Sequence, residues 1–265
     1  MNLFFKYSLV FFISFFISCK PKFNDIPKVE KGNIDPTRFI AIGGSNDAGF
    51  SDGALYNEAQ QNSYVSILAE QLKLIGGGEL NNPYINKNSN GVSVIANNTI
   101  SLNAKFMLGN KTDCKGVSSL SPLRLNANDN YGIFSQSVFS AANPFNNISV
   151  PDAKAIHICA KGYGNNLTMG YYNPYFERMC SNKITASILG DALSQNPTFF
   201  SLNIGIQDVL SFALTGATAD TITSQNRFNA SIDSIIIALT KNGAKGVIAN
   251  IPDLNTLPYF TTIPY

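Results

Sequence analysis

Short apolar runs that alternate with amphipathic helical patterns constrain the fold of this chain more than any other sequence feature. Thr198–Ile204 and Lys245–Ile251 are mainly apolar runs of the length of a buried strand, and a glycine or a proline follows each. Between them, Asn226–Asn242 carries apolar residues at helical spacing, and Gly243 follows as a helix stop. Because both strands are mainly apolar, this strand–helix–strand unit predicts a parallel sheet covered on both faces.

The rest of the chain extends this pattern. Arg38–Gly43 is a third apolar run that ends in glycine, and helices are expected over Asn62–Ile75 and Lys183–Gln195. Asn81–Asn147 is rich in asparagine and serine and only weakly periodic, so we expect a long insertion that contains β-hairpins. A chain of 265 residues, 45% of them hydrophobic, is long enough to bury such a core without a disulfide scaffold.

A short apolar leader precedes this domain. Met1–Ser18 contains one charge, Lys6, and its apolar stretch has the length of a signal-peptide core, too short to span a bilayer comfortably. The tetrapeptide Phe-Ile-Ser-Cys that ends at Cys19 resembles a bacterial lipobox, whose cysteine is lipidated and becomes the first residue of the mature chain. An ordinary secretory signal that contains a cysteine is the alternative. We expect a signal peptide over residues 1–18, a polar tether over 19–36 and a domain over 37–265.

This leader predicts an exported protein. Its acylated Cys19 would insert into the lipid of a bacterial membrane and hold the domain on the periplasmic or cell-surface side. Export would place Cys114, Cys159 and Cys180 in an oxidising compartment, where three thiols form at most one internal bridge.

Composition argues against several classes of function. A net charge of +2 with 14% charged residues provides no basic surface, so we expect no nucleic-acid partner. The chain has one histidine, no C-x-x-C pair and no phosphate-cradling glycine motif before a helix. Neither a metal nor a cofactor is therefore expected.

Polar, glycine-rich segments follow the apolar runs. In an open α/β sheet, ligands bind at the carboxyl ends of the strands, so these segments form the candidate site. Ser45 lies on a tight turn after the first strand, which is a nucleophile position, although a serine there is most often a turn residue. The turns after the strands contribute further candidate site-lining residues, Gly44, Asn46, Gly205 and Asp208.

Four segments resemble one family of enzymes. Phe39–Gln71 resembles the first conserved block of SGNH/GDSL-type ester hydrolases, closest to the version in bacterial surface lipoproteins, where the turn reads roughly Gly-Asp-Ser-Leu-x-x-Gly-Phe-x-Asp-Gly. Asn146–Asn165 and Ser201–Leu210 resemble the second and third blocks, and Gly246–Tyr265 resembles the fourth strand and the loop after it. The resemblance implies a three-layer α/β/α flavodoxin-like sandwich. It also implies hydrolysis of an ester through an acyl-serine intermediate.

The resemblance assigns roles to individual residues. Ser45 matches the nucleophile, and its amide shares the oxyanion hole with a second-block glycine amide and a third-block asparagine side chain. Asp152 aligns with the second-block glycine of the family, with Ser149 as the other candidate for that position, and Gln207 aligns with the third-block asparagine. The Asp152 amide could still donate, but its carboxylate is adverse beside an oxyanion. Gly44 replaces an aspartate that braces the turn in the family.

The general base of the family is a histidine in a late Asp-x-x-His block, and this chain contains no such block. The sequence stops just after the fourth strand. We therefore expect the last strand to be missing, the fourth strand to form an exposed apolar edge, and the chain to be a fragment or a decayed gene product. The single histidine, His157, lies in the second block. A packed helix residue is its ordinary interpretation, and a substitute base for Ser45 is the other.

Three hypotheses about function remain open. The first is a membrane-anchored serine ester hydrolase of the lipase or esterase class, which acts on an ester or acylated-glycan substrate through Ser45 and is impaired in this chain. The second is a non-catalytic surface lipoprotein that binds acylated or glycan ligands, favoured by the joint changes at Gly44, Asp152 and Gln207. The third is a decayed fragment that does not fold stably.

Overall fold

The computed structural model of the protein describes residues 29–95, 99–101, 104–125, 139–165, 167, 172–218 and 220–262. The chain divides into two units, residues 1–30 and 31–265. The predicted signal peptide, Cys19 and the first part of the tether lie outside the described residues. Within the described ranges, no helix has the length and apolar character that crossing a membrane requires.

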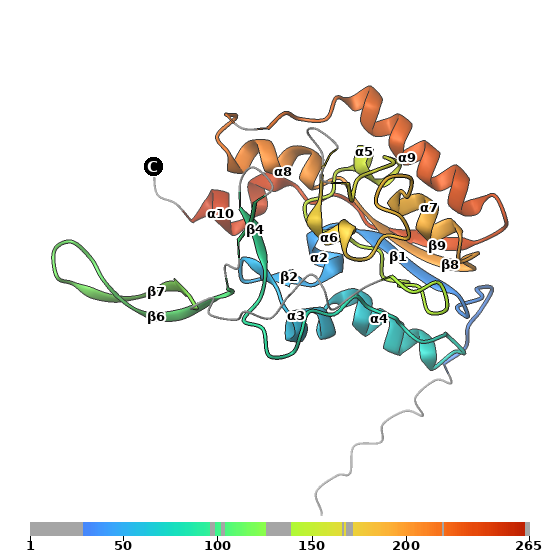
Figure 1. The fold of residues 1–265 in the computed structure, drawn as a ribbon, viewed down its shortest axis with the longest axis horizontal. Coiled ribbons are helices and arrows are strands. Elements are labelled where there is room, and N and C mark those ends of the chain that lie inside the picture. The colour runs from blue at the N-terminus through green and yellow to red at the C-terminus, as the bar shows by residue number, and fades with distance from the viewer. Residues whose placement is uncertain are drawn as a thin grey trace, which may run out of the picture. The chain divides into compact units, whose positions relative to one another are not determined.

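A parallel sheet forms the centre of the larger unit (Figure 1). It pairs its strands in the order β1-β8-β9, with Phe39 opposite Phe199 and Phe199 opposite Lys245. The strands are β1 (Phe39–Gly43), β8 (Phe199–Asn203) and β9 (Lys245–Ile248). All three begin within two residues of the predicted apolar runs, so the prediction of a mixed α/β fold with a parallel sheet is confirmed.

An extended segment lies along the other side of β1. The amide of Ala41 donates to the carbonyl of Asn146 at 2.9 Å, and the amides of Ile148 and Val150 donate to the carbonyls of Ala41 and Gly43 at 2.9 and 3.0 Å. The bridge between Ala41 and Asn147 is parallel. This pairing brings the residues after Val150 to the carboxyl end of β1.

Helices cover both faces of the sheet (Figure 1). Successive side chains of a strand point to opposite faces. Ile40 and Ile42 of β1 accordingly join one buried cluster, which includes Ile188 of α7 (Ile188–Leu193) and Ile235 of α9 (Gln225–Thr240). Phe39 of β1 joins a second cluster, made with α4. The described helices are α2 (Ser45–Ala48), α3 (Asn57–Gln61), α4 (Tyr64–Lys73), α5 (Ala155–Ile158), α6 (Pro174–Glu177), α7 (Ile188–Leu193), α8 (Gln207–Leu214), α9 (Gln225–Thr240) and α10 (Pro258–Thr261), with a 3₁₀ turn, η2 (Leu254–Thr256).

The predicted helices differ in how well they match the helices of the structure. The patterns over Asn62–Ile75 and Asn226–Asn242 correspond to α4 and α9, so both are confirmed. The predicted helix over Lys183–Gln195 is wrong in its first turn, because α7 begins only at Ile188. The side chain of Asn182 accepts hydrogen bonds from the backbone amides of Ile184 and Thr185, and Ser187 caps the start of α7. These side-chain hydrogen bonds replace the first turn of the predicted helix.

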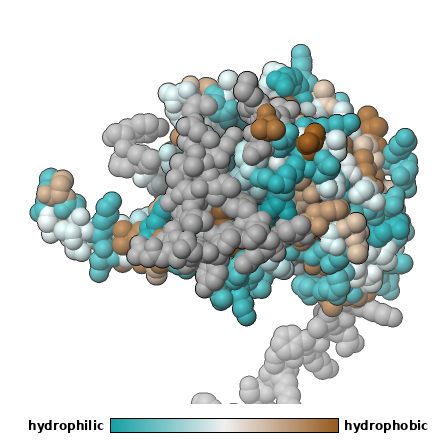
Figure 2. Space-filling model, viewed as in Figure 1, coloured by the Kyte–Doolittle hydropathy of each residue, from teal (hydrophilic) through white to brown (hydrophobic). Residues whose placement is uncertain are grey.

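The predicted insertion contains the expected hairpins. β6 (Phe106–Thr112) pairs antiparallel with β7 (Ser118–Arg124), and β4 (Ser93–Ile95) pairs with β5 (Thr99–Ser101). The carboxylate of Asp113 closes the β6–β7 turn by accepting from the amides of Lys115 and Val117 at 2.8 and 2.9 Å. Hydrophobic and hydrophilic side chains are interspersed along this arm (Figure 2).

β9 is the outer strand of the described sheet beyond β8. All four of its residues are exposed, including Val247 and Ile248. Cys114 is exposed, Cys159 is half-buried and Cys180 is buried, and within the described part of the chain all three are unbridged thiols.

Candidate functional site

A cavity of about 210 Å³ lies at the carboxyl ends of β1 and β8. Because parallel strands end at the same edge of a sheet, their following turns meet there. The cavity collects most of the predicted site residues, together with an apolar wall. Its lining consists of Gly44, Ser45, Asn46, Asp47, Phe50, Asp152, Asn203, Ile206, Gln207, Leu210 and Leu214.

A sharp strand-to-helix turn presents Ser45. β1 ends at Gly43, and the short helix α2 (Ser45–Ala48) begins two residues later and stops at Gly49, whose φ is +79°. A Cβ atom on Gly43 would lie 2.1 Å from the Asp47 Cγ, so only glycine leaves room for this turn. Ser45 is half-buried and lines the cavity.

Asp152 contacts Ser45 through both its backbone and its side chain. Its amide donates to the Ser45 Oγ at 3.1 Å, and its Oδ1 lies 3.5 Å from the same oxygen. Although Asp152 is partly exposed to solvent, desolvation by the surrounding protein atoms raises the pKa of its carboxyl above the usual range. Its φ is +63°, a left-handed conformation that glycine adopts freely and that aspartate tolerates better than most other residues.

Gln207 completes this group of side chains. It is the first residue of α8, and its Nε2 donates to the Asp152 Oδ1 at 2.6 Å. Its Oε1 is buried and has no hydrogen-bond partner within the described part of the chain. Ser45, Asp152 and Gln207 therefore form one contiguous polar group, although they come from three separate segments.

Two of the predicted site residues, Gly205 and Asp208, do not line the cavity. The Asp208 Oδ2 accepts from the Ala155 amide at 2.8 Å and so fixes the start of α5. Gly205 has a φ of +121°, and a Cβ there would lie 2.5 Å from Ile251. Both residues support the turns that carry the site and do not face the cavity. Ser149, the alternative glycine position, is buried outside this lining.

Two polar residues of the cavity were missed by the sequence analysis, Asp47 and Asn203. The Tyr64 hydroxyl donates to the Asp47 Oδ1, and the Asn203 Nδ2 donates to its Oδ2 at 3.0 Å. Burial raises the pKa of Asp47 to about 7. The signal that could have found Asn203 is its place at the end of a buried strand.

His157 takes part in the start of α5 and does not line the Ser45 cavity. Its Nδ1 accepts from the Lys154 amide at 3.2 Å, and its ring stacks on Tyr163 with centroids 4.7 Å apart. Burial lowers the pKa of His157 to about 4, so the imidazole is neutral at pH 7. This arrangement corresponds to the packed, hydrogen-bonded helix residue of the sequence analysis.

The cavity combines a hydroxyl, a carboxyl and a side-chain amide with an apolar wall of Ile206, Leu210 and Leu214. It can hold a polar carbonyl group beside Ser45 and an aliphatic group along the leucines. Over the described residues, no group of three or more His, Cys, Asp or Glu side chains could hold a metal ion. No family model, curated protein or solved structure matches this chain.

Proposed function

We propose that this protein is an exported, lipid-anchored relative of the SGNH/GDSL-type ester hydrolases. In this proposal its cavity binds an ester with the carbonyl group beside Ser45, and turnover is far slower than in an intact serine esterase. The observation that carries the proposal is the meeting of Ser45, Asp152 and Gln207 in one cavity, at hydrogen-bond distances of 2.6 and 3.1 Å.

The sheet supports the flavodoxin-like part of this proposal. The extended segment around Asn147 pairs with β1, followed by β8 and β9. In chain order this arrangement reads 2-1-3-4, as in flavodoxin-like sheets, whose ligands bind where the strand order reverses. Ser45 follows strand 1, beside this switch point.

The backbone of Asp152 supports its alignment with the second-block glycine. A φ of +63° is readily adopted by glycine and is uncommon for other residues, among which aspartate and asparagine adopt it most often. The amide at this position points to the Ser45 Oγ, as a donor at the edge of an oxyanion hole would.

The mechanism we propose begins with attack of the Ser45 Oγ on the ester carbonyl carbon. The carboxylate of Asp152 lies 3.5 Å from the Ser45 Oγ, which donates to it, and takes its proton. The same proton then passes to the departing alcohol, and water later releases the acyl group from serine. The Gln207 amide is engaged by Asp152, so the oxyanion lacks one donor, which typically costs about 10²–10³ in rate.

A fluorophosphonate probe tests this proposal, because it is attacked by an activated serine with loss of fluoride. We expect labelling of the full-length protein at Ser45, identified by peptide mass spectrometry, and no label in Ser45→Ala. Ser51→Ala is the matched control, since Ser51 is an exposed serine close in sequence. Absence of labelling in a protein that unfolds cooperatively would overturn the serine-esterase proposal.

A second candidate function, ligand binding without catalysis, is favoured by the hydrogen bond between Gln207 and Asp152. Because the Gln207 amide donates to the Asp152 carboxylate, it is not available as a donor to a developing oxyanion. This candidate predicts that triacetin binds to wild-type protein and to Ser45→Ala with equal affinity and is not cleaved. Release of acetate by wild-type protein alone would rule it out.

The membrane anchor can be tested separately. If Cys19 is acylated, cells that express the full chain and are fed an alkyne fatty acid should yield a labelled protein in the membrane fraction. Cys19→Ser should lose the label, whereas Cys114→Ser, which changes an exposed thiol of the hairpin turn, should keep it. Equal labelling of both variants would contradict the prediction that Cys19 is the acylated residue of a lipobox.

A further inference from the structure

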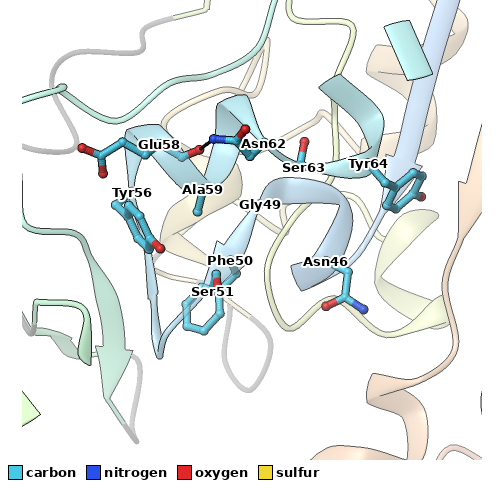
Figure 3. A pocket seen from close by; sticks show the side chains of 10 residues that line it. All are labelled: Asn46, Gly49, Phe50, Ser51, Tyr56, Glu58, Ala59, Asn62, Ser63 and Tyr64. Carbon is cyan, nitrogen blue, oxygen red and sulfur yellow. Dashed lines mark hydrogen bonds between the residues drawn. The ribbon is translucent and has the colours of Figure 1, made fainter. Parts of the chain in front are cut away.

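A second, larger cavity of about 400 Å³ lies beside the Ser45 cavity. Figure 3 shows it between α3 (Asn57–Gln61) and the segment of α2 and β2 (Phe50–Ser51), which is followed by β3 (Ala54–Leu55). The lining side chains that matter here are Asn46, Phe50, Tyr56, Glu58, Asn62 and Tyr64. A volume of this size is within the range of small-molecule sites.

Asn46 and Phe50 line both cavities. Asn46 is exposed, and its side-chain amide has no hydrogen-bond partner within the described ranges. Tyr64 of the second cavity donates a hydrogen bond to Asp47 of the first. One ligand that passes over Asn46 can therefore occupy both cavities.

The two cavities differ in chemistry. The Ser45 cavity has the aliphatic wall of Ile206, Leu210 and Leu214. The second cavity is surrounded by aromatic rings, amides, hydroxyls and one carboxylate, and none of the described residues that line it is cationic. Amide and hydroxyl groups both donate and accept hydrogen bonds, which suits a ligand with many hydroxyl groups.

The charge and the rigidity of the second cavity also favour a neutral polar ligand. Its carboxylate, Glu58, pairs with Lys105 at 3.0 Å, and the Lys105 ammonium also lies 4.1 Å from the centre of the Tyr56 ring. The Tyr56 hydroxyl is held by Asp52 at 2.5 Å. The ring is therefore fixed before a ligand arrives, and the charge of Glu58 is balanced, which favours a neutral polar ligand over an anion.

We propose that the second cavity binds a neutral carbohydrate, the alcohol part of an ester whose carbonyl group lies beside Ser45. The acyl group then lies along Leu210 and Leu214. This inference rests on the proposed function, because it places the two halves of one ester on the two sides of Ser45.

Saturation-transfer NMR with three neutral disaccharides, maltose, cellobiose and N,N′-diacetylchitobiose, tests the carbohydrate site. We expect at least one to bind full-length wild-type protein and Ser45→Ala with equal affinity, since the free sugar needs only the second cavity. Ala59→Trp, which fills this cavity from α3, should weaken binding at least about tenfold. Gln61→Trp, on the same helix outside the lining, should leave binding unchanged.

Glu58→Leu provides a second variant that removes polar lining at an exposed position and should also weaken binding. If none of the disaccharides binds, or if both cavity variants bind like Gln61→Trp, the inference is wrong. Fluorophosphonate labelling of Ser45 separates the two proposals. Labelling without sugar binding overturns the carbohydrate site alone, whereas cavity-dependent sugar binding without labelling overturns the ester chemistry and supports the carbohydrate site.

Discussion

The Gln207 Nε2 donates a 2.6 Å hydrogen bond to the Asp152 Oδ1, directly beside the Ser45 hydroxyl. A side-chain amide at this place would be a donor for an ester carbonyl, and here a carboxylate of the protein itself accepts from it. This relationship decides whether the cavity can stabilise an oxyanion. It also makes Asp152 the residue whose replacement tells most about the site.

Asp152→Gly should lower turnover of p-nitrophenyl acetate at least about tenfold, because it removes the carboxylate that takes the Ser45 proton in the proposed mechanism, an effect that outweighs release of the Gln207 amide. Glycine also adopts the φ of +63° without strain, so the melting temperature should not fall. Asp152→Asn, which keeps the size of the side chain and the backbone conformation but lacks the carboxylate, should lose turnover to a similar extent. A higher rate in Asp152→Gly would instead show that Asp152 is not the base and that its carboxylate obstructs the oxyanion position.

Asp47 should make the protein less stable as the pH rises. Burial raises its pKa from 3.8 to about 7, so between these values the folded state holds a proton that the unfolded state has released. The free energy of unfolding should therefore fall between about pH 4 and pH 7 and level off above. Urea unfolding at pH 5 and pH 8 should show a smaller difference for Asp47→Asn than for wild-type protein. Equal differences in both proteins would contradict the shifted pKa.

His157→Ala should lower the free energy of unfolding by about 1–2 kcal/mol, since it removes the acceptor for the Lys154 amide and the stacking on Tyr163. Fluorophosphonate labelling of Ser45 should persist, because His157 does not line the cavity. Thermal unfolding and mass spectrometry measure the two effects. A folded variant without label would restore His157 as the substitute base.

Gly43→Ala should destabilise the protein by about 1–3 kcal/mol and abolish labelling of Ser45, because the new Cβ would lie 2.1 Å from the Asp47 Cγ. Gly44→Ala is the matched control, since the nearest atom to a Cβ there is the Ala153 carbonyl oxygen at 4.0 Å. Combining Gly43→Ala with Asp47→Ala should restore part of the stability. Equal effects of the two single glycine changes would show that the turn does not depend on this contact.

Sequence periodicity was sufficient to predict the central sheet and its main helices. Each of these patterns depends only on neighbours within a few residues along the chain. The apolar stripe of Asn226–Asn242 forms α9, and the apolar runs that begin at Arg38 and Thr198 form β1 and β8. The position of Ser45 after the first strand was predictable for the same reason. The first turn of Lys183–Gln195 was not, because side-chain hydrogen bonds compete with helical ones there.

The sequence alone thus determined a parallel α/β fold and placed a serine at the carboxyl end of its first strand, since both follow from local apolar spacing. Only the tertiary structure decided what surrounds that serine. It brought the Asp152 carboxylate to the Gln207 amide, buried Asp47 against Asn203, and tied His157 to the start of α5. The Gln207 and Asn203 contacts join residues more than 50 positions apart, and burial shifts the pKa of Asp47 and His157. Desolvation depends on the packing around each group, and no local pattern in the chain encodes it.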